Sequence, residues 1–166
     1  MKLFISDYYI LITFLKKYKI VDGMEKILIS ACLIGDKTRY DGRSNYHPLI
    51  KDLLQKYELV PFCSEVEGGL SIPRKPSEIV RDRVVTVDGK DVTKNYLSGA
   101  EKALNICKYL DIKIAILKDG SPACGVKEIH DGKFSGKKIK GMGITASLLS
   151  RNGIKVISED EIETLL

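Results

Sequence analysis

The sequence predicts an α/β fold with three layers, a Rossmann-like parallel sheet with helices on both faces and a small β-hairpin flap. Short apolar runs alternate with segments of helical period from residue 25 onward, which indicates alternating strands and helices. Such an order is typical of a parallel sheet with right-handed crossovers. Residues 112–117 are apolar almost throughout, as in strands that are covered on both faces. The dipeptide Asp88-Gly89 between two short strand-like runs predicts the hairpin.

The first half of the chain predicts two strands with a helix between them. Residues 27–32 form a buried strand, which a polar turn at 35–42 closes. Ser44 or Asn45 is expected to cap a helix that ends near residue 57. Its apolar stripe consists of Leu49, Ile50, Leu53 and Leu54. Residues 59–63 predict the second strand, followed by a turn at 65–69.

The middle of the chain predicts a loop, the flap and a long helix. Residues 73–80 contain two prolines and are expected to form an extended loop that leads into a short helix near Pro76. Residues 84–87 and 90–93 form the two strands of the flap. Thr93 is expected to cap a helix over about 94–110. The apolar face of that helix consists of Leu97, Ala100, Leu104, Cys107 and Leu110.

The last third predicts two more strands. Residues 112–117 form the third strand, and a glycine- and lysine-rich loop at 131–143 follows the turn at 121–124. A helix over about 144–151 is expected to stop at Asn152-Gly153, before a fourth strand at 154–157. Ser158 is expected to cap a final short helix.

The length of 166 residues predicts one domain, placed at 24–166. Residues 1–23 are expected to be an N-terminal extension, either an amphipathic helix or a segment upstream of a natural start at Met24. The apolar run at 8–15 is too short to span a bilayer, so no membrane partner is expected. A net charge of +5 is too small to predict a nucleic-acid partner. The sequence indicates no oligomeric state.

Three of the four cysteines follow apolar runs of strand length. Cys32, Cys63 and Cys124 therefore all belong at the carboxyl edge of the predicted sheet, where ligands bind in such folds. Isolated cysteines of this kind favour thiolates in a reducing cytoplasm over a disulfide scaffold. Three thiolates at one edge repel each other, so a metal is the natural means of stabilising them. Zinc sites usually use close C-x2-C pairs, which are missing here, whereas four irons on three cysteines leave one iron open for Lewis-acid chemistry.

Polar residues near the thiols suit catalysis. Glu65, two residues after Cys63, is a candidate general base, and Ser121, three before Cys124, is a candidate proton relay. Each also has a purely structural interpretation: Glu65 as a solvated loop carboxylate, and Ser121 as a residue that starts a turn. Candidate substrate-binding or charge-balancing cations are Arg39, Arg74 and Lys118, which equally suit ordinary salt bridges. Cys107 is expected to be a buried hydrophobe, and His47 and His130 are interpreted as structural or incidental.

Three groups of motifs, in order along the chain, resemble the bacterial thiouracil desulfurase family. They are Ala31-Cys32-Leu33 with Arg39-Tyr40-Asp41-Gly42, residues 63–70 with Pro73-Arg74-Lys75-Pro76, and Lys118 with residues 121–125 and 131–136. The resemblance covers about residues 25–157. It implies an oxygen-sensitive [4Fe–4S] cluster on Cys32, Cys63 and Cys124.

The resemblance also implies an activity: removal of sulfur from a small thiolated nucleobase such as 2-thiouracil, without net redox change, to give sulfide. In the implied mechanism an open iron binds the thiocarbonyl sulfur, Glu65 helps water to attack, and Ser121 assists proton transfer to the ring. One departure is Ser64, where the family often has proline. Two other functions stay open: a metal- or nucleotide-binding module with structural zinc, and a thiol-disulfide oxidoreductase, which the missing C-x-x-C disfavours.

Overall fold

Four parallel strands form the central sheet of the computed structural model, which describes residues 23–166. The predicted extension, apart from residue 23, lies outside the described residues. In chain order the strands are β1 (Lys26–Ser30), β2 (Glu58–Phe62), β5 (Ile114–Leu117) and β8 (Lys155–Ser158). Their spatial order is β2-β1-β5-β8, and every neighbouring pair is parallel. The predicted parallel sheet is confirmed.

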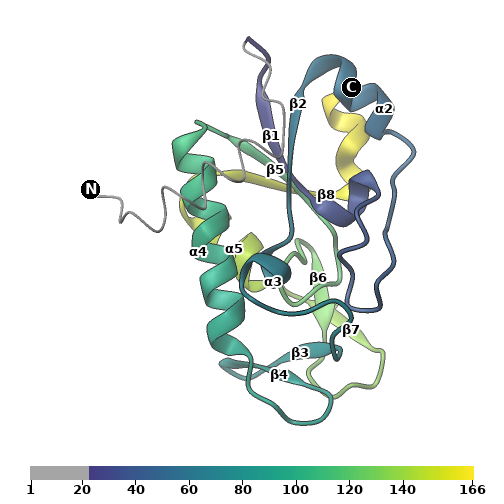
Figure 1. The fold of residues 1–166 in the computed structure, drawn as a ribbon, viewed down its shortest axis with the longest axis vertical. Coiled ribbons are helices and arrows are strands. Elements are labelled where there is room, and N and C mark those ends of the chain that lie inside the picture. The colour runs from purple at the N-terminus through teal and green to yellow at the C-terminus, as the bar shows by residue number, and fades with distance from the viewer. Residues whose placement is uncertain (1–22) are drawn as a thin grey trace.

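Helices cover both faces of this sheet (Figure 1). On one face α4 (Thr93–Tyr109) and α5 (Ile144–Arg151) pack on a core that includes Leu28 and Ala115. On the other, α2 (Ile50–Lys56) and the 3₁₀ helix η2 (Glu159–Leu165) pack on Ile29 and Ile116. Because neighbouring residues along each strand point to opposite cores, the middle residues of the strands are apolar in succession. The three-layer prediction is confirmed.

The hairpin flap exists, but with a different strand pairing. Strand β4 (Arg83–Thr86) pairs antiparallel with β3 (Ser77–Val80), so the expected short helix near Pro76 is wrong. The Asp88-Gly89 turn does form, with the Thr86 hydroxyl bonded to Asp88 and to the Lys90 N–H. Beyond it only one bridge, Val85 to Asp91, continues the expected ladder, because the chain then enters α4.

Three other segments differ from the sequence prediction. The turn expected at 65–69 contains a one-turn helix, α3 (Ser64–Glu67). The loop expected at 131–143 contains part of a second hairpin, formed by β6 (Glu128–His130) and β7 (Lys138–Lys140). Helix α2 begins at Ile50, later than the predicted cap at residue 44 or 45. The N–H groups of Asn45 and His47 instead donate to the carbonyls of Cys32 and Leu33, which belong to the 3₁₀ helix η1 (Ala31–Ile34).

The helix faces also differ in part. Leu54 and Leu97 were expected in the core but are 55% and 48% exposed. Cys107 is buried, as expected. Thr93 does not cap α4: its hydroxyl accepts the Val84 N–H, and Val92 precedes the helix. Ser158 caps η2 through a capping box with Glu161, as the sequence predicts. Among residues 23–166 there is no helix of the length and hydropathy needed to cross a membrane.

Candidate active site

The carboxyl edge of the sheet opens into a cavity of about 450 Å³ that Cys32, Cys63 and Cys124 all line. Cys63 directly follows β2, and Cys32 follows β1 as the second residue of η1. Cys124 lies in the loop after β5. The fold thus brings together three thiols that are up to 92 residues apart, which is the arrangement that the strand-end spacing predicts.

Each of the three thiols is partly buried, and polar groups lie near them. The Asn45 side-chain amide donates to Cys32 Sγ at 3.5 Å, and Cys63 Sγ lies 3.8 Å from the Thr38 carbonyl oxygen. Burial raises the pKa of Cys32, Cys63 and Cys124, and the charges of neighbouring thiolates raise the pKa of Cys32 and Cys124 further. Metal binding reverses this preference, because a bound metal displaces the thiol proton.

The thiol set fits a polynuclear cluster. All four cysteines are free. An iron–sulfur cluster places each thiolate on a different iron and therefore needs thiols that share a cavity. These three thiols line one cavity from three separate loops, as such a cluster requires.

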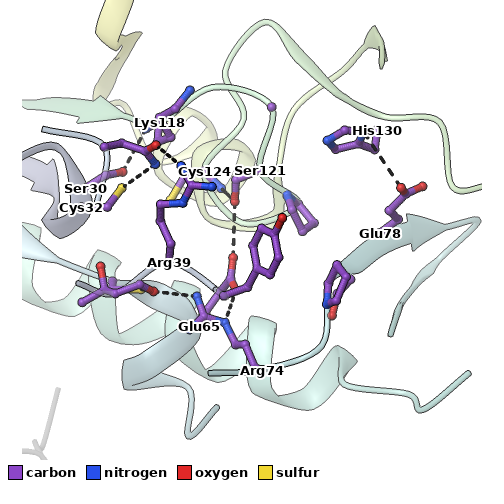
Figure 2. Close-up of a pocket in the computed structure, with 18 of the residues that line it drawn as sticks. Ser30, Cys32, Arg39, Glu65, Arg74, Glu78, Lys118, Ser121, Cys124 and His130 are labelled. Atoms are coloured by element: carbon purple, nitrogen blue, oxygen red, sulfur yellow. Dashed lines mark hydrogen bonds and ion pairs between the residues drawn. The ribbon is translucent and has the colours of Figure 1, made fainter. Parts of the chain in front are cut away.

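Glu65 faces the same cavity from the first turn of α3. Its Oε2 accepts a hydrogen bond of 2.6 Å from Arg74 Nε, and its Oε1 accepts one of 3.4 Å from the Ser121 hydroxyl (Figure 2). Arg74 is held in turn by a 2.8 Å bond to the Thr38 carbonyl. Burial, together with the nearby Glu65 charge, raises the pKa of Tyr96, which keeps that phenol neutral. The carboxylate of Glu65 is therefore fixed in place on the cavity wall.

Ser121 shapes the loop that carries Cys124. Its hydroxyl oxygen accepts the N–H groups of Ala123 and Cys124 at 3.0 and 3.1 Å, so its proton is free to point at Glu65. Asp119 holds the other end of the loop, with one carboxylate oxygen accepting four backbone N–H groups. Burial alone would raise the pKa of Asp119, but these donors outweigh it and lower the pKa. Side chains of the loop thus satisfy many of its own backbone N–H groups.

The three candidate cations all line the cavity, each with a carboxylate partner. Arg39 pairs with Asp41 at 2.9 Å, Arg74 pairs with Glu65, and Lys118 pairs with Glu159. The Lys118 backbone N–H also donates to Ser30 at 3.0 Å, which links the ends of two neighbouring strands. These residues thus reach the site, with their charges already balanced.

Helix α3 lies unusually close to α4. A Cβ added at Gly99 would meet the Ser64 carbonyl oxygen at 1.9 Å, and one added at Gly68 would meet the Asn95 carbonyl oxygen at 2.1 Å. Ser64 is buried, and its hydroxyl accepts a 2.8 Å hydrogen bond from Thr145. The Thr145 backbone N–H donates to Ala123, next to Cys124. Thr145 thus connects the Cys63 turn to the Cys124 loop.

Several cavity residues have no signal in the sequence. Asn45 was expected only as a helix cap, and Tyr96 and Glu78 carried no expectation. His130 was interpreted as structural or incidental, yet it lines the cavity, whereas His47 does not. Each of these residues reaches the cavity through tertiary packing, which spacing along the chain does not reveal.

Comparisons with known proteins agree with this geometry. The family model for 2-thiouracil desulfurase matches residues 27–161. An uncharacterized protein, YbbK of Bacillus subtilis (strain 168), is 41% identical over 150 residues, which cover 84% of this chain and 99% of that protein. The solved structure of the [4Fe-4S]-dependent thiouracil desulfidase TudS is 45% identical with a TM-score of 0.81, and the match covers 85% of this chain and 95% of that one. The chain belongs to the 2-thiouracil desulfurase family.

Proposed function

We propose that this protein is a [4Fe–4S]-dependent desulfurase that converts a thiolated pyrimidine such as 2-thiouracil into the oxo base and sulfide. The observation that carries the proposal is the meeting of three strand-end thiols, Glu65 and Ser121 in one cavity. The family and the TudS neighbour support the same reaction. Water replaces sulfur at the ring carbon and hydrogen sulfide leaves, so the reaction needs no electron donor or acceptor.

Cys32, Cys63 and Cys124 would hold the cluster. When bound, the cluster supplies a Lewis acid for the thiocarbonyl sulfur, at the iron that no cysteine occupies. Both the cysteines and the loops around them are already ordered by contacts such as Asn45 to Cys32 and Ser121 to Cys124. The cytoplasm is the proposed location, because a reducing compartment keeps the four free cysteines from forming disulfides.

Glu65 acts on water. Its carboxylate accepts a proton from a water molecule as that water attacks the ring carbon, and Arg74 keeps the carboxylate oriented through the 2.6 Å bond. Ser121 lies 3.4 Å from Glu65 and exchanges a proton with it, passing it to a ring nitrogen or to the departing sulfur. The two residues thus move the protons that the reaction needs while the thiols hold the cluster.

Sulfide release from 2-thiouracil by anaerobically reconstituted protein tests the proposal. Wild-type protein should release sulfide and uracil in equal amounts. Glu65→Gln and Ser121→Ala should retain the visible absorbance of the cluster and lose at least tenfold in kcat, whereas Cys124→Ala should lose the absorbance itself. Full activity in Cys124→Ala, or a wild-type protein that holds stoichiometric zinc and no acid-labile sulfide, would overturn the proposal.

A further inference from the structure

The cavity has a second polar group, away from Cys32 and Cys124. His130, the last residue of β6, and Glu78 in β3 both line it. Figure 2 draws this pair on the other side of the cavity from Cys32 and Cys124, with Ser121 between. Around the pair the lining is largely apolar and includes Pro76, Val87 and Phe134. A polar pair in such surroundings is well placed to recognise a specific group on a ligand.

The Glu78 carboxylate lies beside the imidazole of His130. The Glu78 side chain is buried, and its Oε2 accepts the Phe134 N–H at 3.0 Å. Its Oε1 lies 4.0 Å from His130 Nδ1, and this ring nitrogen is buried and has no hydrogen-bond partner among the described residues. A nitrogen lone pair that faced a carboxylate would be repelled, so the tautomer that suits this position has its hydrogen on Nδ1. In that tautomer Nε2 is a hydrogen-bond acceptor.

Two other carboxylates that line the cavity already accept hydrogen bonds from the protein. Glu65 is bonded to Arg74 and Ser121, and one oxygen of Asp119 receives four backbone N–H groups. A pyrimidine that leaves water must place its ring N–H donors against acceptors, since an unpaired buried donor is costly. His130 meets this need on the side of the cavity away from Cys32 and Cys124.

Resting on the desulfurase function proposed above, we propose that His130 binds the substrate by accepting a hydrogen bond from a ring N–H, and that Glu78 is its positioning residue. The ligand class is a heterocyclic thioamide with a free ring N–H. In a pyrimidine that donor is either N1–H or N3–H, and the two possibilities are separable by methylation. His130 therefore contributes to substrate recognition and leaves the chemistry to Glu65, Ser121 and the cluster.

Steady-state kinetics of His130→Leu and His130→Gln with 2-thiouracil test this role. The leucine variant should raise KM about tenfold, equivalent to about 1.4 kcal/mol, and change kcat less than threefold. The glutamine variant keeps an acceptor oxygen and should recover most of the loss. His47→Gln, at a histidine outside the cavity, is the matched control and should match the wild type. Thermal unfolding should show the same midpoint for His130→Leu and wild type.

N-methylated substrates identify the donor through a double-mutant cycle. With 2-thiouracil methylated at the nitrogen that contacts His130, wild type and His130→Leu should have equal KM values. With the other methyl derivative, the tenfold difference should persist. Two results would overturn the proposal. One is a KM difference between wild type and His130→Leu that persists with both methyl derivatives, and the other is equal KM values with 2-thiouracil and both derivatives.

Binding of uracil to the cluster-loaded protein separates this proposal from the desulfurase function. Uracil carries the same ring N–H donors and contains no sulfur, so calorimetry measures recognition without turnover. His130→Leu should weaken uracil binding about tenfold. If the wild type binds uracil in this His130-dependent way yet releases no sulfide from thiouracil, the proposed reaction fails and the recognition role stands. Equal uracil affinity in both proteins, or no uracil binding by the wild type, counts against His130.

Discussion

Replacing Gly99 by alanine tests how the fold places Cys63 and Glu65. Gly99 lies in α4, where alanine is normally favoured over glycine by about 1 kcal/mol. A Cβ at this position would lie 1.9 Å from the carbonyl oxygen of Ser64 and 2.7 Å from its carbonyl carbon. Both atoms belong to backbone, so no rotation of a side chain relieves the clash. Helix α3, whose first residue is Ser64, must move away from α4.

The expected cost follows from that contact. Overpacking a well-packed core lowers the free energy of unfolding by about 1–3 kcal/mol. A clash between backbone atoms belongs at the upper end of that range. For a chain of this length, a loss of about 3 kcal/mol lowers Tm by roughly 6–12 °C. Because Ser64 lies between Cys63 and Glu65, its displacement should also lower the iron content after anaerobic reconstitution.

Thermal unfolding of the apoprotein and iron analysis of the reconstituted protein provide the assay. Asn105→Ala, on the exposed side of the same helix, is the matched control and should change stability by less than about 0.7 kcal/mol, through helix propensity alone. A Gly99→Ala protein that unfolds at or above the wild-type temperature and binds iron fully would show that α3 does not depend on this close approach.

Three further predictions concern single interactions. Thr145→Val removes the hydrogen bond to buried Ser64, so it should lower the free energy of unfolding by about 1–3 kcal/mol and speed the loss of iron to a chelator. An unchanged rate of iron loss would contradict the connection between the Cys63 turn and the Cys124 loop. Arg74→Met leaves the largely buried Glu65 carboxylate unpaired and should cost about 3–5 kcal/mol in denaturant unfolding, which adding Glu65→Gln should largely restore. Burial raises the pKa of Cys107 to about 12 from 9.0, so the folded protein keeps a thiol proton that the unfolded chain releases, and the free energy of unfolding should fall as pH rises from 9.0 toward 12. This fall should be less steep in Cys107→Val, and the same pH dependence in both proteins would refute the prediction.

The sheet and its layers are predictable because both depend on hydrophobicity alone. Strand β1 buries Ile27 and Ile29 in one core and Leu28 in the other, so the whole run is apolar and stands out in the sequence. The meeting of the three cysteines follows as well, because each comes after such a run and parallel strands share one carboxyl edge. These features need no knowledge of tertiary contacts beyond the topology.

The flap and the far end of the cavity are not predictable in the same way. Pro76 favours the start of a helix, but residues 77–80 form a strand because they pair with β4 and because Glu78 receives the Phe134 N–H from a distant loop. His130 belongs to a three-residue strand whose partner, β7, contains two lysines and is exposed at every residue. Such short strands carry no hydrophobic pattern, and contacts across the fold decide them.

The content of iron and acid-labile sulfide after anaerobic reconstitution tests the central claim most directly. Three cysteines that hold one [4Fe–4S] cluster predict about four iron and four sulfide per chain in the wild type. Replacing any one of Cys32, Cys63 and Cys124 by alanine should abolish the full cluster, whereas Cys107→Val, at the cysteine outside the cavity, should retain it. A full complement of iron and sulfide in all three alanine variants would contradict the claim.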